Sequence, residues 1–167
     1  MKKIGVIADT HIPRRGHKLP EFLLGELAGV DMIIHAGDIC RDYVIYELEE
    51  IAHVYAVSGN NDDEYLEAML PSRRILEIED CRIGIIHGHH PGRTAAESAK
   101  KAFTGENVNC VVFGHSHIPY NTTANGILYF NPGSAMDKRR QEKYSFGILR
   151  VDGHSITGEI IQFDNKK

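Results

Sequence analysis

The sequence predicts a compact α/β sandwich, in which two β-sheets pack together and helices lie outside them. Strand-like and helix-like segments alternate in the first half of the chain, whereas the second half is mostly strand-like. This order is typical of packed sheets with outer helices. The chain has 167 residues, a length that suits one domain, and we expect residues 1–167 to form it.

The first half alternates strands with helices. Short apolar runs at residues 4–8, 31–36 and 53–58 predict three strands. A short acidic helix is expected at residues 62–70, because Pro71 would end it. Two further helices are predicted by apolar residues at helical spacing, which would face the core. These residues are Phe22, Leu23, Leu27 and Ala28 in a helix that begins at Pro20, and Val44, Ile45, Leu48 and Ile51 in a helix with Asp42 as N-cap.

Two β-hairpins are predicted in the second half, and they make the sheets mixed. The first leaves no room for a helix between its strands, and the second has a favoured two-residue turn at Asp152-Gly153. A capping box from Thr94 to Glu97 begins a helix that reaches about Phe103. Further strands are expected at residues 110–113 and 127–130. The hairpins pair residues 74–78 with 81–86 and residues 144–151 with 155–163.

The composition argues against a nucleic-acid-binding surface. The chain has 19 basic and 23 acidic residues, a formal net charge of −4, and no basic run longer than Lys138-Arg139-Arg140. No segment approaches about 18 continuous apolar residues, and the first apolar run reaches Asp9 too soon for a secretory signal. We therefore expect a cytoplasmic protein with no membrane or nucleic-acid partner. The odd number and wide spacing of Cys40, Cys81 and Cys110 predict reduced core thiols.

Five of the strand-like runs end in Asp, Asn or His. The run from Cys110 to Phe113, for example, continues into Gly114-His115-Ser116-His117. Side chains two residues apart in an extended backbone share a face, and open α/β sheets place their ligand sites at strand ends. We therefore expect two carboxylates, one amide and four imidazoles to converge. These residues are Asp9, His11, Asp38, Asn60, His87, His115 and His117.

This set predicts a site for two divalent metal ions. Seven ligands are too many for one tetrahedral zinc ion, but they suit two adjacent ions that share a bridging carboxylate. Mixed imidazole and oxygen ligands favour Mn, Fe, Co, Ni or Zn over Mg or Ca. The charge of two such ions outweighs that of two carboxylates and a bridging hydroxide, so the site would attract an anion such as phosphate.

The motifs resemble those of the calcineurin-like metallophosphoesterases, and within them the small phosphodiesterases of the YfcE type. They occur in the family's order and span about two thirds of the chain, which makes the set far more specific than any single motif. The motifs are Asp9-x-His11, Gly37-Asp38, Gly59-Asn60, His87-Gly88-His89 and Gly114-His115-Ser116-His117.

The resemblance implies a four-layer α/β/β/α sandwich of two mixed β-sheets, with the site at the strand ends. It also implies a metal-dependent phosphodiesterase, in which a hydroxide bound to two metal ions attacks a small phosphodiester. The implied ions are divalent transition metals, with Mn first and Ni, Co, Fe or Zn as alternatives. One ion would be held by Asp9, His11 and His117, and the other by Asn60, His87 and His115, with Asp38 bridging them. The implied catalytic residues are Asp38, Asn60 and His89.

Asn61 departs from the family's pattern. Many members have at this position a histidine that is thought to protonate the leaving group, and an amide cannot act as a general acid near neutral pH. The proton would then come from water, His89 or Asp62, so we expect good activity on aryl phosphodiesters and weak activity on alkyl monoesters. The role of His89 stays open between supporting a ligand and contacting the substrate, and His35 is expected to be a core histidine.

Other functions stay open at this point. A non-catalytic scaffold such as the retromer subunit Vps29 resembles these enzymes but has lost part of the metal set, whereas all seven ligands are present here. The remaining alternatives are a phosphomonoesterase of the same fold, a single-zinc hydrolase and a metal-storage protein. A homo-oligomer is neither predicted nor excluded. Arg14, Arg15 and Arg139 could contact a phosphate but are expected to be solvated.

Overall fold

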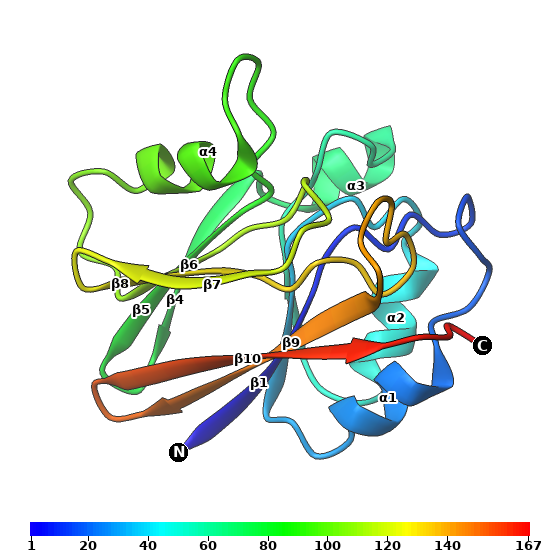
Figure 1. The fold of residues 1–167 in the computed structure, drawn as a ribbon, viewed down its shortest axis with the longest axis horizontal. Helices are drawn as coiled ribbons and strands as arrows, with labels where there is room; N and C mark the ends of the chain where they lie inside the picture. The colour runs from blue at the N-terminus through cyan, green and yellow to red at the C-terminus, as the bar shows by residue number, and fades with distance from the viewer.

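The strands form two five-stranded sheets (Figure 1). A computed structural model describes all residues from 1 to 167. The first sheet contains β1 (Lys2–Ile7), β2 (Met32–His35), β3 (Val54–Ala56), β9 (Tyr144–Asp152) and β10 (Ser155–Phe163). The second contains β4 (Arg73–Ile78), β5 (Cys81–Ile86), β6 (Cys110–Val112), β7 (Tyr120–Ala124) and β8 (Ile127–Asn131). Their orders are β10-β9-β1-β2-β3 and β4-β5-β6-β8-β7.

Three separate apolar clusters define four layers. One cluster of 16 buried residues, which includes Ile34 and Phe130, lies between the inner faces of the sheets. A second cluster lies under α1 (Glu21–Leu27) and α2 (Tyr43–Glu49), and a third lies under α4 (Ala95–Ala102). The remaining helix, α3 (Glu64–Met69), follows β3. The predicted α/β/β/α sandwich is therefore confirmed.

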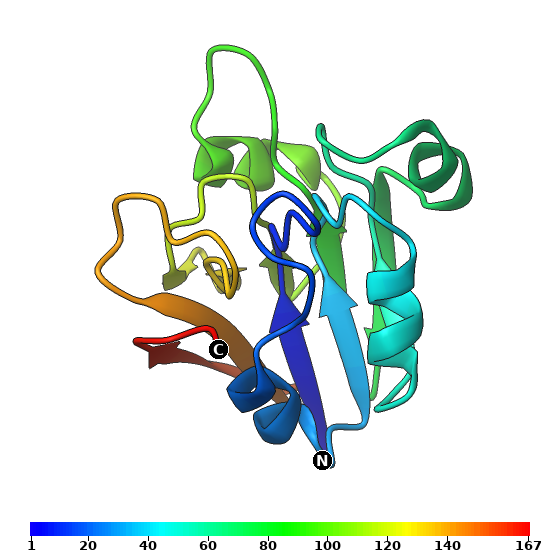
Figure 2. The same cartoon turned by 90° about the vertical axis from the view of Figure 1, so that its right-hand side faces the viewer.

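Both sheets are mixed, as expected. Strands β1, β2 and β3 run parallel, and β9 is antiparallel to β1. In the second sheet β5, β6 and β8 run parallel, with the antiparallel strands β4 and β7 at the edges. Figure 2 shows the arrows of β1 and β2 pointing to the same end of the molecule. The loops that follow the parallel strands of both sheets meet there, which creates the site described below.

Several local predictions are confirmed. The hairpin of β4 and β5 forms with Ile78 opposite Cys81. The capping box of α4 is complete, because the side chains of Thr94 and Glu97 each accept a hydrogen bond from the other's backbone N–H. The three cysteines are free and buried.

No helix of the structure has the length and apolar character that crossing a membrane requires.

The apolar face of α1 is narrower than predicted. Leu23 and Leu27 are buried, but Ala28 is exposed and Phe22 is 44% exposed. Leu23 and Leu27 lie one turn apart and occupy the core-facing side, whereas their neighbours point away from it. Phe22 instead covers the edge of the first sheet, with its ring centroid 5.4 Å from that of Phe163.

Other elements begin or turn elsewhere than expected. The acidic helix begins at Glu64 and not at residue 62, and Asp63 caps it by accepting a hydrogen bond from the backbone N–H of Leu66. In the final hairpin Asp152 pairs with Ser155, so the turn is Gly153-His154 and not Asp152-Gly153. Strand β7 escaped prediction, because its exposed, polar edge position leaves no alternating apolar pattern.

The ring of Phe130 joins the two sheets. Phe130 belongs to β8, is fully buried, and lies against Gly147 of β9 and Gly158 of β10. A Cβ atom on Gly147 would lie 2.3 Å from the ring, and one on Gly158 would lie 2.6 Å from it. The two glycines therefore leave the space that this ring needs.

We expect Gly147→Ala to destabilise the protein by about 2 kcal/mol, because the added methyl group overpacks this contact. Gly25→Ala is the matched control, since a Cβ atom at Gly25 in α1 meets nothing within 4 Å. That change should raise the free energy of unfolding by about 0.5 kcal/mol. Urea denaturation measures both. Equal effects of the two substitutions would show that Phe130 does not need the glycine.

Candidate metal centre

The predicted ligands lie in loops with unusual backbone conformations. Each loop follows a strand: Asp9 follows β1, Asp38 follows β2, His87 follows β5, and His115 and His117 follow β6. Five of these ligand residues have positive φ angles, a region that costs a non-glycine residue on the order of 1 kcal/mol. Such strain is concentrated at functional sites, where the surrounding structure enforces it. The strained residues are Asp9, His11, Asp38, His115 and His117, with φ between 45° and 72°.

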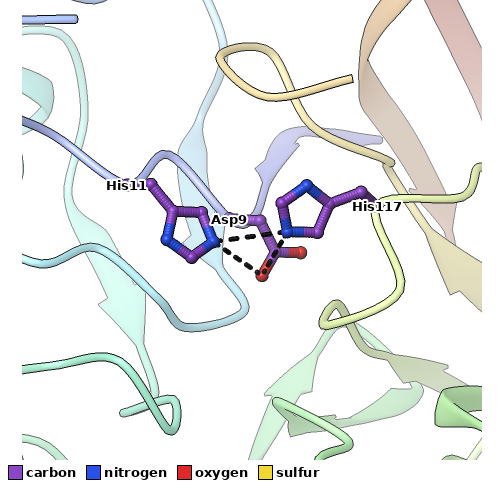
Figure 3. Close-up of side chains that lie close together, drawn as sticks. All are labelled: Asp9, His11 and His117. Carbon is purple, nitrogen blue, oxygen red and sulfur yellow. Dashed lines mark hydrogen bonds and ion pairs between the residues drawn. The ribbon is translucent and has the colours of Figure 1, made fainter. Parts of the chain in front are cut away.

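The first cluster contains Asp9, His11 and His117 (Figure 3). The Nε2 atoms of the two imidazoles are 3.3 Å apart. The Oδ1 atom of Asp9 lies 3.8 Å from Nε2 of His11 and 3.7 Å from Nε2 of His117. All three side chains are buried, and one donor atom from each points to the same small volume.

The second cluster contains Asp38, His87 and His115, whose donor atoms also lie within 4.8 Å of one another. Oδ2 of Asp38 lies 3.2 Å from Nε2 of His87 in this cluster and 3.5 Å from Nε2 of His11 in the first. One carboxylate oxygen therefore faces both clusters. This is the position that a bridging ligand needs.

The orientation of the imidazoles suits metal binding. His87 directs Nδ1 to the carbonyl oxygen of Ala36 at 2.8 Å, and His117 directs Nδ1 to that of Asp137 at 2.6 Å. A carbonyl only accepts, so in the neutral rings Nδ1 carries the proton and the Nε2 lone pairs face the centre. Oδ1 of Asp9 and Nε2 of His87 are buried without a hydrogen-bond partner. Divalent cations would satisfy these atoms, so the residues present fit metal ions.

The pKa shifts show how the centre behaves as a set of buried charges. Burial raises the pKa of Asp9 to about 7. Burial alone would lower the pKa of His87, but the neighbouring carboxylates of Asp38 and Asp9 raise it to about 9. Burial lowers the pKa of His117 to about 4, which keeps this imidazole neutral and its lone pair available at pH 7. Protons thus balance the buried charge where a metal ion would otherwise do so.

Asn61, and not Asn60, contacts Asp38. The backbone N–H of Asn61 donates to Oδ1 of Asp38, and its side-chain Nδ2 donates to Oδ2, both at 2.8 Å. Asn60 is exposed. The sequence offered two adjacent amides at this strand end, and the spacing alone could not show which of them turns toward Asp38.

Asp62 is a structural residue. Its buried carboxylate accepts hydrogen bonds from the backbone N–H groups of Asp38, Cys40 and Gly59. It therefore ties the loop after β2 to the loop after β3. These bonds occupy both of its oxygens, so it is not placed to protonate a leaving group.

The other histidines fall into two groups. His35 is a fully buried core histidine, with Nε2 3.1 Å from the hydroxyl of Thr10 and Nδ1 accepting from the N–H of Gly37. His89 is exposed at the edge of the second cluster, and its ring centroid lies 5.3 Å from that of His87 and 6.2 Å from that of His115.

The segment after β8 supports the first cluster. The hydroxyl of Ser134 donates to the carbonyl oxygen of Asp9 at 2.8 Å, and it accepts from the N–H of Asp137. Asp137 in turn accepts, through its carbonyl oxygen, the hydrogen bond from His117.

The positive charge of Arg139 also acts on the histidines of the centre. This charge lowers the pKa values of His11, His115 and His117, although burial is the larger cause of each shift.

Comparison with known families identifies residues 1–154 as a calcineurin-like phosphoesterase superfamily domain. The chain belongs to this family. It is 36% identical over 160 residues to a probable metallophosphoesterase of Methanothermobacter thermautotrophicus, and the alignment covers 95% of this chain and 91% of the relative. It is 31% identical over 120 residues to the phosphodiesterase YfcE of Escherichia coli, covering 68% and 61% of the two chains. The predicted family is thus confirmed.

Solved structures place the fold of this calcineurin-like phosphoesterase beside two kinds of protein. An archaeal phosphodiesterase has a TM-score of 0.73 and 25% identity, with 95% of this chain and 99% of that chain covered. Vps29 of Chaetomium thermophilum has a TM-score of 0.85 and 23% identity, with 97% and 89% covered. The similarity to Vps29 shows the shared fold alone.

We expect this phosphoesterase to bind two Mn²⁺ ions per chain, one at each cluster. His11→Ala should remove one ion and His115→Ala the other, because each deletes a ligand of one cluster only. His154→Ala, at an exposed residue of the final hairpin, is the control and should keep both ions. Elemental analysis after dialysis gives the stoichiometry. A single ion per wild-type chain would contradict the two-cluster interpretation.

Proposed function

We propose that this protein is a metal-dependent phosphodiesterase with two divalent transition-metal ions, Mn first and Ni, Co, Fe or Zn as alternatives. The observation that supports this most directly is the shared position of Asp38, whose Oδ2 faces an imidazole of each cluster. Relatives that are named phosphodiesterases point in the same direction. Two ions in such a site activate a water molecule and stabilise charge on the attacking and leaving oxygens of a phosphate ester.

The residues of this chain would divide the work as follows. Asp9, His11 and His117 would hold one ion, His87, His115 and the amide of Asn60 would hold the other, and Asp38 would be available to both. Asn61 positions Asp38, because its two hydrogen bonds fix both carboxylate oxygens. His89 would contact the substrate, a role that its position at the exposed edge of the second cluster supports.

Two features support a preference for diesters with good leaving groups. The position next to Asn60 carries an amide, which cannot donate a proton to a leaving oxygen near neutral pH. Asp62 uses its carboxylate to hold backbone N–H groups. Only His89 and water remain as proton donors, so a leaving group that needs no proton, such as p-nitrophenolate, should react best.

The first experiment compares bis-p-nitrophenyl phosphate with p-nitrophenyl phosphate. Metal-stripped protein should regain activity when Mn²⁺ is added, with the diester as the better substrate. Asp38→Ala should lower kcat/KM about 100-fold or more, because it removes the carboxylate shared by both clusters. His154→Ala should keep full activity. Binding of two ions without turnover on either ester would contradict this proposal and favour the non-catalytic scaffold.

A second experiment tests the role of Asn61. We expect Asn61→His to raise kcat/KM for alkyl phosphomonoesters about 10-fold or more, because it supplies the missing general acid. Asn61→Ala is the matched control, since it also removes the side-chain hydrogen bond to Asp38 but adds no acid. Similar losses in both variants would show that this position acts only through Asp38. The pH dependence of kcat with the alkyl ester separates the two outcomes.

A further inference from the structure

The loop that joins β8 to β9 places three consecutive basic residues beside the metal centre. Two cavities open on this loop, with volumes of about 400 and 390 Å³. Lys138 and Arg139 line both of them. Because the protein as a whole has a net charge of −4, a local concentration of positive charge next to the centre calls for a functional explanation.

Two of the positively charged side chains that line the first cavity already have partners within the protein. Arg15 pairs with Asp137 at 3.2 Å, and Lys166 donates to the carbonyl oxygen of Met136 at 2.9 Å. The second cavity differs, because no acidic residue lines it and its two guanidinium groups form no ion pair. Its lining residues are Ser116, Ile118, Lys138, Arg139, Arg140 and Gln141.

The second cavity is fixed relative to the metal centre from both sides. On one side Ser116 lies between His115 and His117, one from each cluster. On the other side the basic loop begins at Asp137, whose carbonyl oxygen holds His117. The same loop is tied through the hydroxyl of Ser134 to the backbone of Asp9. The cavity therefore keeps its position whenever the first cluster is formed.

We propose that this cavity binds a second phosphate group of the substrate, next to the scissile phosphodiester at the metal centre. Arginine guanidinium groups match the geometry of phosphate oxygens, and unpaired ones can bind without first breaking an internal ion pair. The preferred substrates are then phosphodiesters that carry an additional phosphate, and Arg139 is the central binding residue. This inference rests on the proposed phosphodiesterase function for its catalytic part only.

The test uses two esters that differ in one group. The p-nitrophenyl ester of thymidine 5′-phosphate and the same ester with a 3′-phosphate share the scissile bond and the leaving group. We expect wild-type kcat/KM to be about 10-fold higher for the 3′-phosphorylated ester. In Arg139→Gln the ratio of the two kcat/KM values should fall close to one.

Arg150→Gln is the matched control. Arg150 is a half-buried arginine that pairs with Glu159 on the final hairpin and lies opposite Lys3 at the start of β1, away from the strand ends. This variant should keep the wild-type ratio. A wild-type ratio near one, or an equal change in both variants, would overturn the proposal.

A binding measurement separates this inference from the catalytic proposal. Calorimetry with the Mn²⁺-loaded protein compares thymidine 3′,5′-bisphosphate with thymidine 5′-phosphate. Tighter binding of the bisphosphate by about 10-fold, lost in Arg139→Gln, supports the cavity even if neither ester is hydrolysed. Equal affinities would refute the second phosphate site, whether or not the protein is a phosphodiesterase.

Discussion

The arrangement of the centre depends on the carboxylate of Asp38. This side chain approaches an imidazole of each cluster, and the surrounding loops are built to hold it there. Asn61 donates to both of its oxygens, and Asp62 accepts a hydrogen bond from its backbone N–H. Gly59 leaves the necessary space, because a Cβ atom there would lie 2.2 Å from Oδ1 of Asp38. The loop after β3 thus holds Asp38, which follows β2, in its position.

Holding these groups together carries a cost that the rest of the fold must offset. Two buried carboxylates, those of Asp9 and Asp38, lie against the same imidazole, that of His87, and several ligand residues have left-handed backbone conformations. The apolar cluster between the sheets lies directly below these loops and provides a rigid base. In the absence of metal the charges are balanced by protons, as the raised pKa values of Asp9 and His87 indicate. Protons and metal ions therefore compete for the same lone pairs.

The sequence predicted the parts of this protein that follow from periodic patterns. The apolar runs predicted β1, β2, β5 and β6. Because these strands run parallel within their sheets, the polar residues that follow them converge. The direction of individual side chains was harder to predict. Asn60 and Asn61 have the same chemistry, and only the backbone path after β3 decides that Asn61 reaches Asp38.

Tertiary contacts account for the other differences. Phe22 has the apolar character of a core residue, but one position along a short helix moves it from the core to the edge of the sheet. Asp62 resembles a helix cap in sequence, yet the N–H groups that it satisfies belong to other loops. The support from Ser134 was equally hidden, because 125 residues separate it from Asp9 along the chain. The local sequence pattern therefore does not determine the contacts of a side chain whose partner lies far away along the chain.

The fold separates the chemistry of the centre from its surroundings. The ligand residues come from the ends of inner strands, where the cores of both sheets restrict any change. The basic part of the loop between β8 and β9, residues 138–143, is half-buried to exposed and carries no ligand, so its side chains can differ without removing a ligand from either cluster. Its tie to His117 through Asp137 still fixes it against the centre. A segment that is fixed in position but holds no ligand is where selection between substrates of one reaction type can be built, and in this chain that segment carries Arg139 and Arg140.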